Sequence, residues 1–158
     1  MVILGIDPGS QRVGYGLVRK EKGLLKFLDA GILKIESKKD GRVLWETKNQ
    51  VERLIKKNKP EILGIEKIYF GRNRKSVLQV AQSRGVIMLV AFEHGLEIVE
   101  YSPNEVKAGV TGYGLAGKKA VAKMVRAILG KPDLKVVDDA TDALAVAVLA
   151  SQRPFLKG

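Results

Sequence analysis

Short apolar runs separated by turn residues dominate the first third of the chain. Val2–Ile6 is continuously apolar, Gly14–Val18 follows a glycine-rich turn, and Leu24–Ile35 carries a third apolar stretch. Runs of this length, bounded by turn residues, predict strands. Because the connecting segments are too short for helical crossovers, we expect these three strands to be antiparallel.

The hydrophobic pattern then changes to a helical period. Apolar side chains recur three and four residues apart from Val43 to Ile55, and this helix is expected to end before Pro60. Ile62–Ile68 predicts a fourth strand and Ile98–Tyr101 a fifth. Helical spacing marks four later segments, namely Ser76–Glu93, a helix starting at Ser102–Pro103, Lys118–Leu129 and Asp139–Ser151.

The predicted elements follow the order β-β-β-α-β-α-β-α-α-α, with a glycine-rich loop over Gly109–Gly117. This order is typical of an α/β fold with a mixed five-stranded sheet flanked by helices. The three N-terminal strands should be antiparallel and the later ones parallel. A length of 158 residues favours one domain, which we place at residues 1–152. Residues 153–158 are expected to form a frayed tail.

Charge and composition narrow the functional classes. The chain carries 28 Lys and Arg against 17 Asp and Glu, a net charge of +11, which indicates a polyanion partner, with nucleic acid first. Solubility alone would also explain this charge. Cysteine is absent and His94 is the one histidine, which excludes disulfides, thiolate metal sites and a cysteine nucleophile. Neither a signal peptide nor a membrane-spanning stretch is found, so we expect a cytoplasmic protein.

Several carboxylates stand in apolar surroundings. Asp7 ends the first predicted strand, Glu66 lies inside the fourth, and three aspartates open the last helix. An ionised carboxylate in such surroundings requires a paired cation or a metal ion. Only Lys67 adjoins Glu66, and no cation lies within Val136–Gln152. These acids therefore favour a bound divalent cation such as Mg²⁺, which prefers hard carboxylate oxygens.

The spacing of the acids favours one common pocket. Asp139 and Asp142 are three residues apart and share a helix face. Asp7 and Glu66 stand at or near the carboxyl ends of strands, where α/β folds gather functional groups. If the last helix packs beside the first strand, four carboxylates converge. Two-metal phosphodiester hydrolysis requires such an arrangement.

Ordinary structural roles remain open for each acid taken alone. Asp138 or Asp139 could cap the last helix, where acids also interact favourably with the helix dipole. Glu66 could pair with a lysine, and Asp7 could be a turn residue before Pro8–Gly9. The joint occurrence of the acids favours the metal site.

Four short motifs follow one another along the chain. GIDPGS at Gly5–Ser10, followed by GYG at Gly14–Gly16, forms the first. The others are IEKIYFGRNRKSVLQVAQSRGV at Ile65–Val86, EYSPNEVKAGVTGYGLAGKKAVAKMV at Glu100–Val125 and DDATDALAVAV at Asp138–Val148. In this order they resemble the RuvC-type Holliday junction resolvases over almost the whole chain. Each motif is weak alone, but four in the right order are specific.

The resemblance implies an RNase H/integrase-like fold and a homodimeric, Mg²⁺-dependent endonuclease. Such an enzyme nicks two opposite strands of a four-way DNA junction during recombination and repair, with the RuvA–RuvB branch-migration complex as partner. We expect two Mg²⁺ ions per active site, with Mn²⁺ able to substitute, and products with 5′-phosphate and 3′-hydroxyl ends. The family's catalytic and metal-binding carboxylates fall on Asp7, Glu66, Asp139 and Asp142.

The resemblance also implies a DNA-binding surface. The family's important lysines fall on Lys107 and Lys118, and its junction-inserting aromatic falls on Tyr69, beside Phe70. Which of these two rings inserts is left open, and either could be a core residue. Neighbouring cations suit a surface that grips phosphates while an aromatic stacks on bases. The predicted DNA-contacting residues are Tyr69, Phe70, Arg72, Arg74, Lys75, Lys107, Lys118, Lys119 and Lys123.

Ser76–Glu93 is the predicted dimer interface, because it carries enough apolar residues to cover both its own sheet and a partner. A two-fold dimer would match the approximate two-fold symmetry of a junction. The alternative is that this helix packs only on its own sheet.

Three other functions were weighed. The first turn also resembles the phosphate loop of the sugar kinase, actin and Hsp70 ATPases, but those need two such domains, for which 158 residues are too few. A related nuclease that acts on ribosomal RNA precursors would share the fold and Asp7, whereas the Lys107–Lys118 segment favours the resolvase. A non-catalytic junction-binding protein would not need all four carboxylates.

Overall fold

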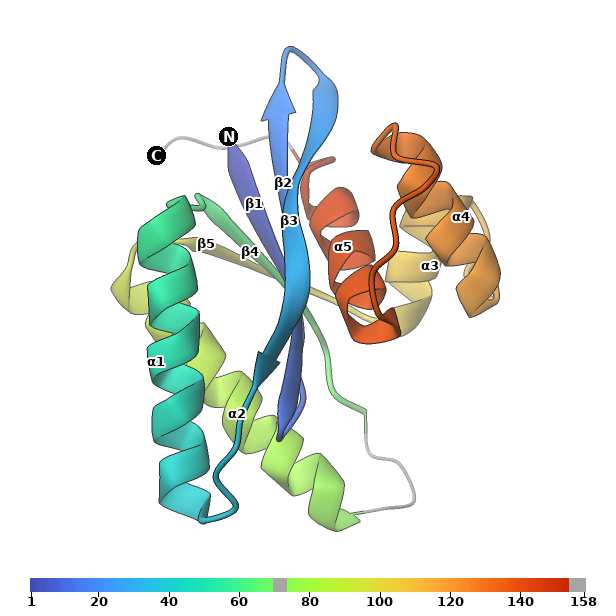
Figure 1. The fold of residues 1–158 in the computed structure, drawn as a ribbon. Helices are drawn as coiled ribbons and strands as arrows, with labels where there is room; N and C mark the ends of the chain where they lie inside the picture. Colours follow the sequence, from blue (N-terminus) through green and yellow to red (C-terminus); the bar gives the residue numbers. More distant parts are fainter. Residues whose placement is uncertain (70–73, 154–158) are drawn as a thin grey trace.

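The computed structural model describes residues 1–69 and 74–153 of the chain (Figure 1). Its elements follow the order expected from the sequence, so the predicted succession of strands and helices is confirmed. The elements are β1 (Val2–Asp7), β2 (Arg12–Glu21), β3 (Leu24–Lys34), α1 (Asp40–Asn58), β4 (Ile62–Glu66), α2 (Arg74–Glu93), β5 (Glu97–Tyr101), α3 (Pro103–Thr111), α4 (Lys118–Ile128) and α5 (Asp138–Ala150).

The strands form one five-stranded sheet in the order β3-β2-β1-β4-β5. The pairs β1–β2 and β2–β3 are antiparallel, whereas β1–β4 and β4–β5 are parallel. Short turns can join only antiparallel neighbours, and the parallel strands are joined through α1 and α2. The α/β class with a mixed, five-stranded sheet is thus confirmed.

Helices cover both faces of the sheet (Figure 1). Helices α1 and α2 pack on one face, where Leu4, Ile6 and Leu63 belong to one buried apolar cluster with side chains of both helices. Helices α3, α4 and α5 lie on the opposite face, where Ile3 and Ile62 belong to a second cluster. The central strands are buried on both faces, and this explains their continuous apolar runs.

Glycines line the sheet face that receives α5. Alternation along β1 turns Gly5 toward the helix, and a Cβ there would stand 2.6 Å from the main-chain nitrogen of Ala147. On β4, a Cβ on Gly64 would stand 3.0 Å from the Ala150 side chain. Glycines on the sheet and alanines on the helix therefore allow a close approach, which brings the start of α5 next to the ends of β1 and β4.

Several predicted boundaries were wrong, and β2 runs from Arg12 to Glu21 where Gly14–Val18 was predicted. The fourth strand ends at Glu66, whereas the apolar pattern extended it to Ile68. The last paired residues are Ile65 with Ile6 and Glu66 with Tyr101, and beyond them Lys67 donates one further main-chain hydrogen bond, to Tyr101 at 2.8 Å. Helix α3 continues through Gly109 to Thr111, which shortens the predicted glycine-rich loop. Of the predicted tail 153–158, all but Arg153 lies outside the described residues.

Among the helices in the described part of the chain, none is long and apolar enough to cross a membrane.

Candidate active site

Two carboxylates stand side by side at the end of the central strands. Asp7 is the last residue of β1 and Glu66 is the last residue of β4. Parallel pairing runs up to Ile6–Ile65, so the two acids follow immediately in register. Alternation places both on the face that α5 covers, because Gly5 and Gly64, two residues earlier on each strand, contact α5.

The first turns of α5 bring two further carboxylates to the same place. Gly14 pairs with Asp7 across β1 and β2, and a Cβ on Gly14 would stand 3.1 Å from the Asp139 Cβ. Asp142 follows one turn later, and both aspartates are half-buried. The predicted convergence of Asp7, Glu66, Asp139 and Asp142 on one end of the sheet therefore agrees with the structure.

Asp138 stands at the margin of this cluster, where burial raises the pKa of Asp142 and the charge of Asp138 adds to this effect. It is exposed, in agreement with its exclusion from the predicted site. Its proposed role as helix cap was wrong, because the N-cap of α5 is Val137 and no side chain caps the helix. As the first helical residue, Asp138 still places negative charge at the positive end of the helix dipole.

The carboxylates raise one another's proton affinity. Burial raises the pKa of Asp7 to about 7, and the nearby charges of Glu66, Asp142 and Asp139 add to this effect. Burial and the charge of Asp142 likewise raise the pKa of Glu66, while Lys107 and Lys118 lower it. Such a cluster of acids requires positive charge to be fully ionised at neutral pH.

A cavity of about 240 Å³ opens beside the acids, between the end of β4 and helices α3, α4 and α5. Glu66 and Asp142 line it on one side, and Lys107 and Lys118 bring positive charge to it. Acidic and basic side chains thus share one hollow. Its lining residues are Glu66, Pro103, Val106, Lys107, Lys118, Val121, Asp142 and Ala145.

Two cations distant in sequence pair with the α5 aspartates. Lys118 Nζ lies 3.5 Å from Asp142 Oδ2, and Arg12 Nε lies 3.2 Å from Asp139 Oδ2. The sequence inference that these acids lack cationic partners was therefore wrong. Lys118 was singled out by resemblance, but Arg12 was missed. Arg12 stands two residues before Gly14 and therefore on the same face of the strand. This position was the available sign that Arg12 faces the acids.

The donor set fits a divalent cation, although the carboxylates are not gathered around one point. Within residues 1–69 and 74–153, no group of three acids or histidines is placed so that it could hold a metal ion. Two of the acids are turned to Lys118 and Arg12 instead. The four carboxylates are nevertheless hard oxygen ligands of the kind that divalent cations prefer. The raised pKa of Asp7 shows that this group of acids needs positive charge to ionise.

The predicted DNA-binding residues are only partly described. Tyr69 is 60% exposed in the segment after β4, and Lys119 and Lys123 are exposed on α4. Phe70 and Arg72 lie outside the described residues. The first two residues of α2, Arg74 and Lys75, are described for their backbone alone.

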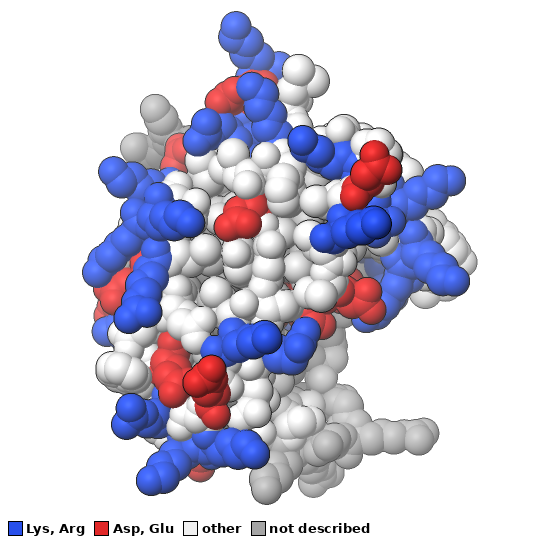
Figure 2. All heavy atoms as spheres, in the orientation of Figure 1, with Lys and Arg blue, Asp and Glu red and all other residues white. Residues whose placement is uncertain are grey.

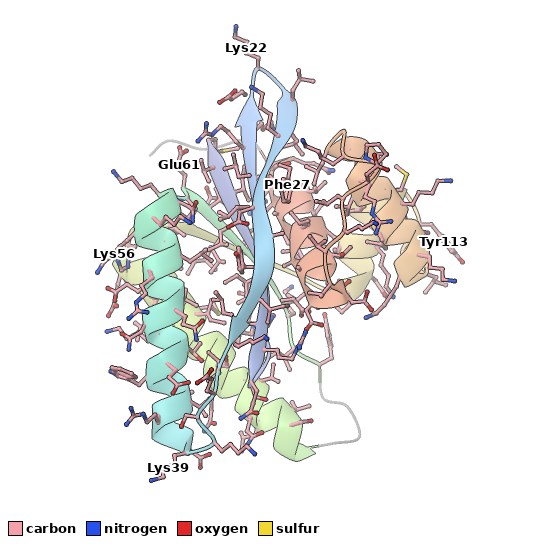
Figure 3. All side chains as sticks on the ribbon, in the orientation of Figure 1. Lys22, Phe27, Lys39, Lys56, Glu61 and Tyr113 are labelled. Atoms are coloured by element: carbon pink, nitrogen blue, oxygen red, sulfur yellow. The ribbon has the colours of Figure 1, made fainter. Side chains whose placement is uncertain are left out.

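Basic side chains are spread over the surface. Figure 2 shows Lys and Arg around much of the margin of one face, with acidic side chains between them. In Figure 3, Lys22 lies at the tip of the β2–β3 hairpin, and Lys39 and Lys56 lie at the two ends of α1. The positive charge is thus not confined to the cavity.

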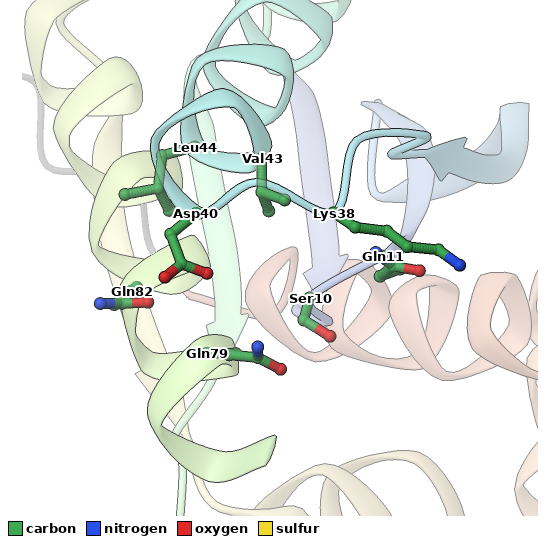
Figure 4. A pocket seen from close by; sticks show the side chains of 8 residues that line it. All are labelled: Ser10, Gln11, Lys38, Asp40, Val43, Leu44, Gln79 and Gln82. Atoms are coloured by element: carbon green, nitrogen blue, oxygen red, sulfur yellow. The ribbon is translucent and has the colours of Figure 1, made fainter. Parts of the chain in front are cut away.

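A second, much smaller hollow lies between the β1–β2 turn, the start of α1 and helix α2 (Figure 4). Its volume is about 30 Å³, which suits a water molecule rather than a substrate. Asp40 is the only carboxylate among its lining residues, so this hollow has no cluster of acids.

The chain is similar to known resolvases over nearly its full length. The family model of the crossover junction endodeoxyribonuclease RuvC matches residues 3–150. The protein of that name from Syntrophomonas wolfei is 43% identical over 149 residues, covering 94% of this chain and 87% of the relative. The Thermus thermophilus RuvC structure superimposes with a TM-score of 0.86 at 30% identity, covering 96% of this chain and 93% of that one.

A second solved structure, T. thermophilus RuvC in complex with Holliday junction substrate, gives a TM-score of 0.84 at 27% identity, over 96% of this chain and 93% of that one. The fold and the acidic end of its sheet define a nuclease with an RNase H/integrase-like architecture. More specifically, the chain belongs to the RuvC family of crossover junction endodeoxyribonucleases, which are metal-dependent nucleases. The predicted resemblance and nuclease class are confirmed.

Proposed function

We propose that this chain resolves four-way DNA junctions by paired, symmetric nicks in homologous recombination and DNA repair. The observation that carries the proposal is the convergence of Asp7, Glu66, Asp139 and Asp142 beside Lys107 and Lys118. Acids that need positive charge, next to cations that attract phosphate, suit hydrolysis of a nucleic-acid backbone. We assign this activity to a single nuclease domain over residues 1–152.

Two Mg²⁺ ions are the proposed cofactors, with Mn²⁺ able to substitute. Asp7, whose charge interacts with those of Glu66, Asp142 and Asp139, would hold the ions together with these three acids through carboxylate oxygens. When bound, the ions activate the attacking water and stabilise charge on the leaving oxygen, which yields 5′-phosphate and 3′-hydroxyl ends. The protein's own contribution is to hold these carboxylates on rigid strand and helix ends.

Lys118 and Lys107 are proposed to hold the phosphate at the cavity. Both side chains line it, and Lys118 also pairs with Asp142. With Asp142 engaged as a metal ligand, the Lys118 ammonium would be available to donate to a phosphate oxygen. Lys119 and Lys123 extend the positive surface along α4 and would contact the backbone farther from the cut.

The segment after β4 is the proposed junction-opening element. Tyr69 is three residues beyond Glu66 and exposes most of its side chain, a position that allows its ring to stack on a base near the cut strand. We propose Phe70, Arg72, Arg74 and Lys75 as its neighbours on DNA. Whether Tyr69 or Phe70 inserts is answered by comparing Tyr69→Ala with Phe70→Ala on junctions that carry 2-aminopurine at the crossover.

Helix α2 is the proposed homodimer interface. Leu78, Leu89 and Phe92 are exposed apolar side chains that recur along one side of the helix, while Ile87 and Val90 on another side are buried in the core. Gly85 lies between the exposed residues, and a Cβ added there would meet no atom of another element within 4 Å, which leaves room for close helix contact. Paired cuts require two active sites, and a two-fold dimer supplies them.

We further propose, from family membership alone, that the enzyme works in the cytoplasm with the RuvA–RuvB branch-migration complex. Co-sedimentation of the protein with junction-bound RuvA and RuvB tests this association. Sedimentation with the junction alone and not with the protein complex would contradict it.

The central experiment incubates the protein and Mg²⁺ separately with labelled four-way junction DNA, duplex DNA, structured RNA and ATP. Symmetric nicks in the junction alone are the expected result. RNA cleavage would instead support the related RNA-processing nuclease, and ATP turnover would support the ATPase-like alternative. The Asp7→Asn variant is the matched control, because it should bind the junction without cutting it.

A further inference from the structure

Arg12 forms an ion pair with Asp139, one of the carboxylates of the proposed metal site. It is the first residue of β2, and its Nε lies 3.2 Å from Asp139 Oδ2 and donates a hydrogen bond to it. Two residues later, Gly14 pairs with Asp7 and approaches the main chain of Asp139. Alternation puts Arg12 and Gly14 on the same face, so the start of β2 directs the guanidinium toward the start of α5.

The pairing accounts for the arrangement of the acids. Asp142 pairs with Lys118 and Asp139 pairs with Arg12, so each of these two aspartates has its own cation. In the described part of the chain, no three acids are placed to bind one metal ion together. Arg12 on β2 and Lys118 on α4 therefore offset part of the negative charge of the four carboxylates.

We propose that Arg12 is a competing counter-ion for Asp139, which must release the carboxylate before Asp139 binds metal. This proposal rests on the proposed function, in which Asp139 is a metal ligand. Arg12 is a positioning residue in this scheme, since it acts on the metal through Asp139. It keeps Asp139 paired until an ion arrives and thereby lowers the affinity of the empty site.

The exposure of the pair makes this exchange feasible. The side chains of Arg12 and Asp139 are 56% and 37% exposed, so their ion pair is screened by water and easily broken. A divalent ion that contacts several carboxylates at once interacts more strongly than one exposed guanidinium. After the exchange, the freed guanidinium lies next to the site, where a phosphate oxygen of the bound strand can take the place of Asp139.

The test measures Mn²⁺ affinity of the DNA-free protein by isothermal titration calorimetry and by the electron paramagnetic resonance signal of free Mn²⁺. We expect Arg12→Gln to bind Mn²⁺ about 2–5-fold more tightly, the gain that corresponds to losing one exposed ion pair. Arg12→Lys should stay close to the wild type because it retains a cation. The matched control is Arg19→Gln on the same strand, where Arg19 pairs with Glu21 at 3.6 Å, and it should leave the affinity unchanged.

A second readout follows the guanidinium itself. In the ¹H–¹⁵N spectrum of the wild type, the Nε–H signal of Arg12, assigned by its loss in Arg12→Gln, should shift when diamagnetic Mg²⁺ is added. Unchanged or weaker Mn²⁺ binding by Arg12→Gln, or an Nε–H signal that does not respond to Mg²⁺, would overturn the proposal.

Asp139→Asn separates this proposal from the proposed function. If Asp139→Asn loses metal affinity while Arg12→Gln behaves as the wild type, Asp139 is a ligand and only the competition is wrong. If Asp139→Asn binds Mn²⁺ like the wild type, the metal-site assignment itself fails. Tighter Mn²⁺ binding by Arg12→Gln together with weaker Mn²⁺ binding by Asp139→Asn supports both the counter-ion proposal and the metal-site assignment.

Discussion

Gly5 on β1 and Ala147 on α5 approach so closely that a Cβ on the glycine would stand 2.6 Å from the alanine nitrogen. This contact places α5 almost directly on the central strand. The same approach continues toward the active end, where Gly14 lies against Asp139. Close packing of helix on strand therefore sets the separation of the acids on α5 from Asp7.

Replacing Gly5 with alanine should push α5 away from the sheet. We expect a loss of about 3 kcal/mol in the free energy of unfolding, typical of overpacking a well-filled core. Urea denaturation followed by circular dichroism measures it. Gly41→Ala is the control, because nothing lies within 4 Å of the added methyl, and its stability should not fall. Equal stability of the two variants would contradict the close packing of α5.

Asp7→Asn should abolish junction cleavage while leaving junction binding intact. Asp7 is coupled to the other three acids, so its loss disturbs the whole donor set. Mutating a residue that only supports a metal ligand typically lowers metal affinity or activity about 10–100-fold. Loss of Asp7, itself a proposed ligand, should therefore lower the cleavage rate by more than about 100-fold. Single-turnover cleavage with Mg²⁺ and a gel-shift assay with Ca²⁺ measure the two properties. Cleavage at the normal rate would refute the assignment.

The stability of the metal-free protein should fall as the pH rises toward neutrality. Folding raises the pKa of Asp7 from 3.8 to about 7, so the folded state binds more protons between these values. This contribution is therefore complete below about pH 4 and is lost as the pH rises through about 7. The loss is on the order of 4 kcal/mol, since the pKa rises from 3.8 to about 7 and one pKa unit corresponds to about 1.4 kcal/mol.

Urea denaturation in EDTA across this pH range measures the effect, with Asp7→Asn as the comparison. The difference in stability between the two proteins should grow in favour of Asp7→Asn as the pH rises. Adding Mg²⁺ at pH 8 should recover stability in the wild type and not in the variant, because the ion binds the ionised acids. A pH-independent difference would show that Asp7 does not titrate in this range.

Lys118→Ala should impair cleavage with little cost in stability. The Lys118 side chain is 74% exposed, so breaking its ion pair with Asp142 should cost less than about 1 kcal/mol of folding free energy. Losing one hydrogen bond from a charged donor to phosphate should slow cleavage about 10–100-fold. Lys107→Ala should behave similarly. Lys48→Ala on α1, also an exposed lysine, serves as control, and a Lys118→Ala protein that fails to fold would contradict this role.

Phe92→Glu should convert a dimer into monomers. Phe92 exposes 75% of its surface on α2, and a buried charge at a two-fold contact would face its own copy. Sedimentation velocity measures the oligomeric state. Trp45→Glu on α1 is the control, because Trp45 is also an exposed aromatic but lies outside the proposed interface. A Phe92→Glu protein that sediments like the wild type would place the interface elsewhere.

Local pattern was enough to predict the element order. The apolar run of β1 and the helical spacing of α1 depend on neighbours along the chain, so they can be recognised without tertiary information. Element ends were harder to predict. Beyond Glu66 the predicted strand continued to Ile68, but β4 ends where its neighbour β5 ends, at Tyr101.

Sequence alone singled out the acids that are candidates for a functional role, because burying an ionised carboxylate among apolar residues costs free energy in any fold. Only the tertiary structure decided what surrounds them. Arg12 and Asp139 are 127 residues apart, and no local pattern links them. Their pairing depends on the close approach of α5 to the glycine face of the sheet, and electrostatic interactions depend on distance in space rather than along the chain.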